Sequence, residues 1–213
     1  MPLAPLGDGW HPLLSRARDQ IAQELRDVTL PELPLAPLAK LLDLVAVWNA
    51  RTDLTAARDP AALVDLYLPD ALVLAAGASG HWVDVGSGGG APALTLALLS
   101  PELSLTLVEP RDKRVAFLRT AVGELRLSRV NVRRARSDAL DSASFDVAVS
   151  RATLSPEEWL AEGARLATSA VWVLLARGAA PALDGFAVDR ELAYSWPASG
   201  APRRALRYVR ATS

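Results

Sequence analysis

The 213-residue sequence contains no cysteine and only two histidines, His11 and His81. Without cysteine the chain forms no disulfide and no thiolate metal site. Two histidines alone make a histidine-rich metal centre or a Ser-His-Asp triad difficult to build, so we expect no metal site. The chemistry of this protein is therefore expected to proceed without a thiol and almost without an imidazole.

Long apolar runs are also missing. No stretch approaches the roughly 18 apolar residues that a membrane-spanning helix needs. Residues 1–14 lack the basic region and apolar stretch of a secretory signal. We therefore expect a cytoplasmic monomer that does not associate with membranes. The length suits one α/β domain with an appendage, and the 51% of hydrophobic and 22% of charged residues are ordinary for a globular chain.

The net charge of −1 conceals an uneven distribution. Residues 111–136 contain nine basic and two acidic side chains, and four further arginines lie within 203–210. This asymmetry favours a basic face that binds a polyanion such as RNA, although solvated helix and strand faces in an arginine-rich protein explain it about as well. The candidate RNA-binding residues are Lys113, Arg114, Arg133, Arg134 and, further along the chain, Arg177.

The first 80 residues carry helical patterns only. Apolar residues recur at helical spacing over 13–27 and 35–50, and prolines separate these two stretches. A third helix is predicted over about 60–78, because Asp59-Pro60 provides an N-cap followed by a proline in the first turn. We expect residues 1–79 to form a helical extension that packs on the rest of the chain.

From residue 80 onwards, predicted strands alternate with predicted helices, which indicates a mostly parallel sheet with helices on both faces. The last two strands flank a turn at 197–202 and read as an antiparallel hairpin. The expected fold is therefore an α/β, Rossmann-like domain over 80–213 with a seven-stranded sheet. The predicted strands span 82–85, 104–108, 130–134, 145–150, 169–176, 186–195 and 203–211, and the predicted helices 92–100, 112–126 and 155–167.

The central motif is a glycine-rich turn from Asp84 to Pro92 that follows a predicted strand and opens a predicted helix. Its glycines permit positive φ and let a ligand approach the backbone closely, and the helix start offers unpaired N–H groups. Ligands of open α/β sheets bind at this edge, beyond the carboxyl ends of the strands. The candidate cofactor-binding residues in the turn are Asp84, Gly86, Ser87, Gly88, Gly90 and Pro92.

Two cofactors fit this turn. Gly86-x-Gly88-x-x-Ala91 matches the dinucleotide pattern, and Glu109 supplies the acid that binds the ribose of either NAD or S-adenosylmethionine (SAM). Three features favour SAM: Asp84 can face the cationic methionine end, the turn follows a helical region, and the sheet ends in an antiparallel hairpin as in SAM methyltransferases. The motif alone still admits NAD.

Three further segments fall at the same sheet edge. Ser137 and Asp138 follow the third strand, where they either contact adenine or form a polar turn. Arg151 follows the fourth strand, where the methyl group and the substrate would meet. It either contacts an RNA phosphate or the target base, or it is a surface arginine. We take it as the candidate catalytic residue, with a role in positioning the substrate and contacting the cofactor. Asp53-Leu54-Thr55 ends the second helix and either folds back over the cofactor or simply terminates the helix.

These motifs together resemble the RsmG (GidB) family of bacterial 16S rRNA guanine-N7 methyltransferases. The resemblance implies SAM as cofactor and a guanine N7 of 16S rRNA in the small ribosomal subunit as acceptor. Because N7 carries no proton, the implied reaction needs no general base and rests on positioning and electrostatics. The resemblance covers about 40–180, in consistent order, through Trp48-Asn49, Asp53-Leu54-Thr55, Asp84 to Pro92, Lys113-Arg114 with Phe117-Leu118, Arg136-Ser137-Asp138 and Ser150-Arg151-Ala152.

The chain departs from the family pattern at several positions. Asp53 stands for an asparagine, Tyr67 for a histidine, Ala93 for a glycine and Arg177 for a lysine. These departures leave the exact RNA target open. The alternatives are a SAM-dependent methyltransferase of a small molecule or a protein, and an NAD-binding oxidoreductase.

Overall fold

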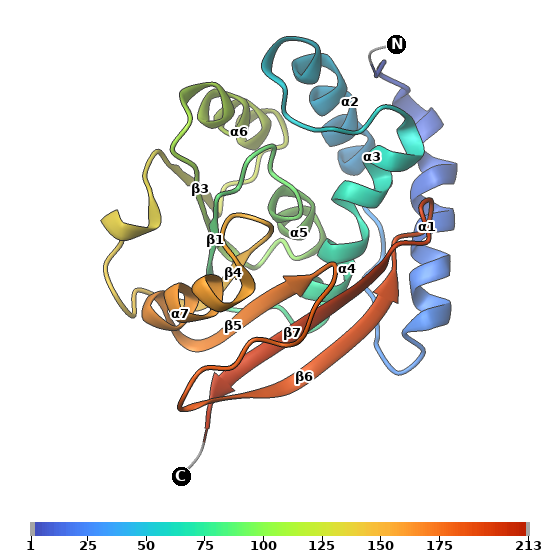
Figure 1. Ribbon diagram of the computed structural model, residues 1–213. Coiled ribbons are helices and arrows are strands. Elements are labelled where there is room, and N and C mark those ends of the chain that lie inside the picture. Colours follow the sequence, from blue (N-terminus) through green and yellow to red (C-terminus); the bar gives the residue numbers. More distant parts are fainter. Residues whose placement is uncertain (1–2, 212–213) are drawn as a thin grey trace.

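The computed structural model describes residues 3–211, and its strands form a seven-stranded sheet (Figure 1). Residues 1–2 and 212–213, the outer ends of the two predicted domains, lie outside the described part. The strand order is β3-β2-β1-β4-β5-β7-β6; β1 to β5 are parallel, and β7 is antiparallel to β5 and β6. The expected fold class is thereby confirmed. The strands are β1 (His81–Val85), β2 (Ser104–Val108), β3 (Val130–Arg133), β4 (Phe145–Ser150), β5 (Ala167–Leu175), β6 (Phe186–Ser195) and β7 (Pro202–Arg210).

Two of the helices begin at a local capping signal in the sequence. Asp59 accepts the Ala62 N–H at 2.8 Å, and Ser155 forms a reciprocal capping box with Glu158. None of the helices within residues 3–211 is both long and apolar enough to cross a membrane. The helices are α1 (Trp10–Glu24), α2 (Leu35–Thr52), α3 (Pro60–Tyr67), α4 (Pro69–Ala75), α5 (Ala93–Leu99), α6 (Asp112–Glu124) and α7 (Pro156–Leu166), with short 3-10 helices η1 (Gly7–Gly9) and η2 (Ser137–Ala139).

The third predicted helix is not continuous. The prediction of a single helix over 60–78 is wrong, because the chain forms α3 and α4 with a break between Tyr67 and Pro69. Pro69 has no N–H to continue the hydrogen-bond pattern of α3, and it takes the first position of α4 instead. Tyr67 and Asp70, on either side of the break, both line the cavity described below.

The helices cover the two faces of the sheet unequally. Trp82 and Trp172 face a core shared with helices α1 to α6, whereas Val83 and Val171 face a second core closed by α7. This division follows from the alternation of side chains along each strand. The helical extension and the sheet therefore share one continuous core on the first face.

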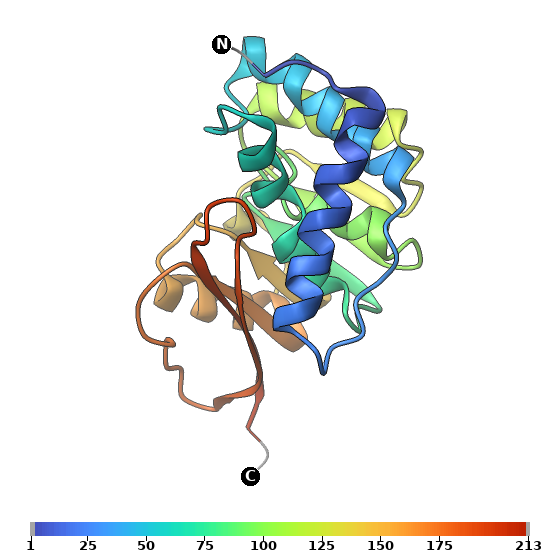
Figure 2. The ribbon, with the colours of Figure 1, turned by 90° about the vertical axis from the view of Figure 1, so that its right-hand side faces the viewer.

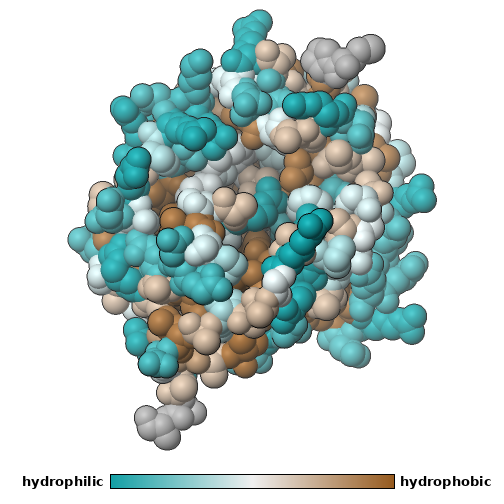
Figure 3. All heavy atoms as spheres, viewed as in Figure 1, coloured by the Kyte–Doolittle hydropathy of each residue, from teal (hydrophilic) through white to brown (hydrophobic). Residues whose placement is uncertain are grey.

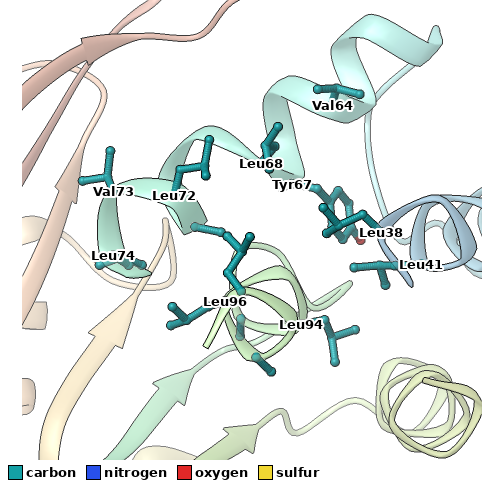
Figure 4. Packing of buried hydrophobic residues seen from close by; sticks show 14 of the residues in the cluster. Leu38, Leu41, Val64, Tyr67, Leu68, Leu72, Val73, Leu74, Leu94 and Leu96 are labelled. Atoms are coloured by element: carbon teal, nitrogen blue, oxygen red, sulfur yellow. The ribbon is translucent and has the colours of Figure 1, made fainter. Parts of the chain in front are cut away.

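Helix α5 lies at the centre of that first core. Figure 4 shows Leu68 and Leu72 of the α3–α4 region above Leu94 and Leu96 of α5, with Leu38 and Leu41 of α2 to one side. All six side chains are buried. Because α5 directly follows the glycine-rich turn, its packing against α4 fixes the direction in which that turn leaves β1.

The C-terminal hairpin returns to the helical extension. Figure 2 shows α1 running alongside the hairpin, and Glu24 at the end of α1 accepts the Ser195 N–H at 2.7 Å. The buried carboxylate of Asp65 in α3 accepts the N–H groups of Ala198 and Ser199 at 2.8 and 2.9 Å. The tip of the hairpin is thus held beside the carboxyl ends of the parallel strands.

We expect Leu72→Ala to lower the free energy of unfolding by about 2–5 kcal/mol, because the substitution leaves a cavity in a fully buried contact. Urea denaturation followed by circular dichroism measures this loss. Val47→Ala is the matched control, since Val47 in α2 is 53% exposed, and it should change stability by less than about 0.5 kcal/mol. Equal effects of the two substitutions would contradict the described packing.

Candidate active site

The backbone of the turn after β1 is fixed by β2. The N–H groups of Gly86 and Ser87 both donate to the Val108 carbonyl, at 2.8 and 3.1 Å. Gly86 and Gly88 have φ of 73° and 56°, a region that favours glycine. A Cβ at Gly86 would also collide with the Thr153 side chain. The turn consequently presents bare backbone to the space above the sheet.

Glu109, at the end of β2, is buried and bonds to the turn. Its Oε2 accepts the Gly88 N–H and its Oε1 accepts the Arg111 N–H, both at 2.9 Å. The Arg114 guanidinium lies 4.0 Å from Oε2. A carboxylate has about four lone-pair sites, so Glu109 retains acceptor capacity toward a ligand.

Tyr67 secures the middle of the turn from the helical extension. Its hydroxyl donates to the Gly89 carbonyl. Burial raises the pKa of Tyr67 well above its ordinary value, which keeps the hydroxyl protonated as a donor. A Cβ at Gly89 would lie 3.0 Å from the Tyr67 oxygen and 3.1 Å from the Leu54 carbonyl oxygen. Glycine at position 89 therefore complements tyrosine at position 67.

The segment after α2 folds back over the turn. Asp53 has a left-handed backbone with φ of 48°, and the Asn49 side chain accepts the Thr55 N–H at 2.9 Å. Leu54 and Thr55 then line the cavity. Asparagine and aspartate both visit the left-handed region more readily than other non-glycine residues, so Asp53 in place of the family asparagine is compatible with this turn.

Asp84 lies buried behind the turn, with 2% of its surface exposed. Its Oδ2 has no hydrogen-bond partner in the part of the chain that the structure describes. Burial raises the pKa of Asp84 to about 6, against the opposing effects of a Ser87 hydrogen bond and the Arg151 charge. An unsatisfied buried polar atom is rare in a native fold, and a cationic ligand group would satisfy this one.

Arg151, directly after β4, is anchored by an ion pair. Its Nη1 donates to the Leu66 carbonyl at 2.6 Å and to Asp70 Oδ2 at 3.0 Å. The second oxygen of Asp70 accepts the Tyr194 hydroxyl at 2.8 Å and the Trp196 Nε1–H at 3.0 Å. Asp70 is itself buried. One carboxylate therefore connects α4, Arg151 and the hairpin.

These groups surround a cavity of about 910 Å³ at the carboxyl ends of the strands. Its volume falls in the upper part of the range of about 300–1,000 Å³ that is usual for ligand sites. One part is lined by the glycine-rich turn and Glu109, the other by Arg151, Arg177, Trp196 and Arg203. Figure 3 shows a hollow near the middle of the face in view, with hydrophilic side chains along its rim. Two differently lined parts suit a cofactor and a substrate.

The predicted cofactor-binding residues occupy different places around this cavity. Ser137 and Asp138 form η2, where Arg165 of α7 donates to the Ser137 carbonyl at 2.8 Å, and they do not line the cavity. Three residues stand in β1 or the turn without lining it: Asp84, Gly90 and Pro92. The residues that do line it are Gly86, Ser87, Gly88, Glu109 and Arg151.

The predicted RNA-binding residues are likewise divided. Arg114 and Arg177 line the cavity. Lys113 and Arg133 are exposed outside it. Arg134 is exposed as well, and its Nε lies 2.7 Å from Asp112. The basic segment 111–136 thus reaches from the cavity to the outer surface.

Sequence reasoning missed several residues at the cavity. Asp70, Trp196 and Arg203 were not among the candidates, yet all three line it. Trp196 and Arg203 flank the predicted hairpin turn, and no local pattern indicates which side of the sheet that turn faces. The proline next to Asp70 was the available signal, because it marks the helix break that brings the carboxylate to this place.

The fold and the site define a class of protein. The strand order with an antiparallel β7 differs from the parallel dinucleotide-binding order, and it is the order of SAM-dependent methyltransferases. The family described as GidB, rRNA small subunit methyltransferase G, matches residues 35–195. The chain belongs to this family.

Individual relatives agree with this assignment. The ribosomal RNA small subunit methyltransferase G of Halorhodospira halophila is 41% identical over 183 residues, which cover 83% of this chain and 82% of that protein. The protein of the same name from Stenotrophomonas maltophilia is 37% identical over 144 residues, 67% of this chain and 68% of that one.

Solved structures are similar in fold. A SAM-dependent methyltransferase from Aquifex aeolicus aligns with a TM-score of 0.51 at 17% identity, covering 70% of this chain and 92% of that chain. TYW2 of M. jannaschii in complex with AdoMet aligns with a TM-score of 0.52 at 12% identity, covering 67% of this chain and 75% of that chain. At these identities the likeness supports the fold alone.

We expect Gly89→Ala to lower the free energy of unfolding by about 1–3 kcal/mol, because its Cβ would press on the Tyr67 oxygen and the Leu54 carbonyl. Tyr67→Phe removes one of these two atoms, so the double variant should lose less than the sum of the two single losses. Urea denaturation of the four proteins measures the coupling. Strictly additive losses would argue against the contact.

Gly123→Ala provides the control for the Gly89 substitution. Gly123 lies in α6, and a Cβ there meets no atom within 4 Å. Alanine is the better helix former by about 1 kcal/mol, so this variant should be as stable as the unmodified chain or more stable.

Proposed function

We propose that this chain transfers a methyl group from SAM to N7 of a guanine in the 16S rRNA of the small ribosomal subunit. Membership of the rRNA small subunit methyltransferase G family supports the enzyme class, a SAM-dependent rRNA methyltransferase. The observation that carries the proposal is the meeting of the glycine-rich turn and Glu109 with an arginine-lined wall around one cavity. The first part suits the cofactor, and the second suits a polyanionic substrate.

The residues present fit SAM. The unpartnered Asp84 oxygen lies behind the turn, from where its charge would attract the ammonium group of the methionine part, and Glu109 has acceptor capacity for the ribose hydroxyls. Gly86 and Gly88 allow the cofactor to approach the backbone. Ser137 and Asp138 stay as proposed adenine contacts, because η2 follows β3 at the same edge of the sheet.

The chain aligns two reactants and needs no acid or base of its own. When bound, SAM supplies an electrophilic methyl carbon on a positively charged sulfur. The N7 lone pair would form the new bond to that carbon while the carbon–sulfur bond would break with its electron pair left on sulfur, so that the positive charge would pass to the purine. N7 carries no proton to remove, so alignment and electrostatics account for the catalysis.

Arg151 is suited to positioning the acceptor base. A free guanidinium beside the purine would oppose the positive charge that develops there. Asp70 neutralises Arg151 at 3.0 Å, while the guanidinium has five N–H donors and keeps some of them for the substrate. We therefore assign Arg151 to orienting the base, next to the cofactor.

RNA would approach across the basic segment of α6 and β3. Lys113 and Arg133 are exposed and have no acidic partner within residues 3–211. The pair between Arg134 and Asp112 is a surface pair and contributes little, so Arg134 is available to a phosphate. These residues would bind RNA without sequence preference, with an affinity that falls steeply as salt rises.

The two predicted domains would work as one unit. Tyr67 and Asp70 come from the extension over 1–79, and they contact the turn and Arg151 of the domain over 80–213. We propose that the enzyme acts as a monomer in the cytoplasm, with the small ribosomal subunit as its partner and without a membrane or metal requirement.

The deciding experiment measures methyl transfer from labelled SAM to small ribosomal subunits, and to protein-free 16S rRNA, from a strain that lacks the enzyme. Recovery of the label as N7-methylguanosine after digestion supports the proposal. SAM binding with no incorporation into any RNA would reject the RNA substrate in favour of a small molecule or a protein. Calorimetry that finds tight NAD binding and no SAM binding would reject SAM itself.

We also expect SAM affinity to rise with pH through about 6. The pKa of Asp84 is raised to about 6 by burial, so the carboxyl is mostly neutral at pH 5 and mostly ionised at pH 7. Only the ionised form attracts an ammonium group. SAM should therefore bind roughly tenfold more weakly at pH 5 than at pH 7, as measured by calorimetry.

Two variants separate this effect from other titrations. Asp84→Asn should bind SAM weakly and lose the tenfold pH dependence. Asp189→Asn, on the outer strand β6 and paired with Arg207, should keep the dependence of the unmodified protein. A rise of equal size in Asp84→Asn would contradict the role of Asp84.

A further inference from the structure

We propose that Arg203 and Arg177 bind the phosphate adjoining the target guanosine, with Trp196 as the platform that orients Arg203. This assignment rests on the proposed function. It identifies the part of the cavity that receives the RNA backbone. It also places Trp196 and Arg203, which both come from the C-terminal hairpin, in the substrate site.

Arg203 is held flat against an aromatic ring. Its Cζ lies 3.7 Å from the centre of the Trp196 ring, and Nη1 donates to the Pro202 carbonyl at 2.8 Å. Among residues 3–211, no carboxylate lies within ion-pair distance of Arg203. A guanidinium that lies over one face of a ring keeps its remaining in-plane N–H groups available, and these match the oxygens of a phosphate. Arg203 is therefore oriented, charged and available to an anion.

The platform under Arg203 is fixed to the buried interior. The Trp196 Nε1–H bonds to Asp70, which also anchors Arg151. The turn beyond Trp196 is fastened by Asp65, whose oxygens accept two backbone N–H groups and the Ser199 hydroxyl at 2.8 to 2.9 Å. Arg203 consequently needs little ordering when it binds a ligand, which favours affinity.

Arg177 and Arg203 both lie where the end of β5 runs beside the start of β7. Leu175, the last residue of β5, pairs with Arg204 of β7, and Arg177 follows Leu175 two residues later in the chain. Side chains alternate along β7; Arg203 points to the same face as the buried Ala205 in the first core, and Arg204 to the other face, where Glu191 binds it at 2.6 Å. Arg177 and Arg203 both line the cavity.

Charge decides between the phosphate and the base as the target of these two arginines. The purine gains a positive charge during methyl transfer, so an unpaired guanidinium in contact with it would raise the barrier. Arg151 has its charge neutralised by Asp70. Arg177 and Arg203 have no carboxylate partner among the described residues, and the phosphate next to every nucleoside is the anion that such a pair would bind.

The test compares Arg203→Gln with Arg26→Gln, an exposed arginine just after α1 that lies outside both basic segments. The assay is methylation of small ribosomal subunits by the full-length protein at several salt concentrations, with SAM binding measured separately by calorimetry. For Arg203→Gln we expect the KM for subunits to rise roughly tenfold and SAM affinity to change less than about twofold. In a plot of the logarithm of the binding constant against the logarithm of the salt concentration, the slope should become shallower by about one, because about one counterion fewer is released.

A second variant removes the platform together with its hydrogen bond to Asp70. Trp196→Leu keeps the Arg203 charge but removes the ring, so we expect a raised KM for subunits with a salt dependence close to that of the unmodified protein. Arg26→Gln should match the unmodified protein in KM, salt dependence and SAM affinity.

The outcomes distinguish this assignment from the proposed function. If the unmodified protein methylates subunits and Arg203→Gln does so with the same KM and salt dependence, the phosphate assignment alone is wrong. A loss of SAM affinity in Arg203→Gln equal to the loss for subunits would also overturn it, because it would place Arg203 at the cofactor. If the unmodified protein binds SAM and methylates no RNA, the proposed function fails and the assignment fails with it.

Discussion

The arrangement of the cavity depends on one buried carboxylate. Asp70 binds a guanidinium through one oxygen and two neutral donors through the other, and these partners come from the end of β4 and from the C-terminal hairpin. A buried charge is tolerated only where such partners replace the lost water. Removing any of them leaves Asp70 less well compensated, so the helical extension, Arg151 and the hairpin hold one another in place.

The position of Asp70 follows from the break at Pro69. Tyr67, which precedes the break, fixes the glycine-rich turn, and Asp70, which follows Pro69, fixes Arg151. In a continuous helix these two side chains, three residues apart, would lie only about 60° apart around the axis, at roughly 100° per residue, and would share one face, whereas the break lets each reach its own part of the cavity. The cofactor part and the substrate part are therefore built from the same short piece of chain.

Sequence alone predicted the features that are encoded locally. The glycine-rich turn, the cap at Asp59 and the alternation of strands and helices depend on neighbouring residues, and each was found where expected. The contacts of Asp70 with Tyr194 and Trp196 join positions more than 120 residues apart, and no local pattern encodes them. The break at Pro69 does have a local signal, because a proline in the middle of a predicted helix argues against the continuity of that helix.

The residues that depart from the family pattern fit the structure around them. Asp53 occupies a left-handed turn that aspartate and asparagine share, and Tyr67 is matched by Gly89. Ala93 is buried at the start of α5, where alanine favours the helix over glycine, and Arg177 preserves a cation at the cavity. None of these exchanges alters the arrangement of charges at the cavity, in which Arg177 and Arg203 have no acidic partner among the described residues and Arg151 is neutralised by Asp70. Such a pattern suits an acceptor that is anionic at its backbone and becomes cationic at its base, as a guanine nucleotide of RNA does on methylation at N7.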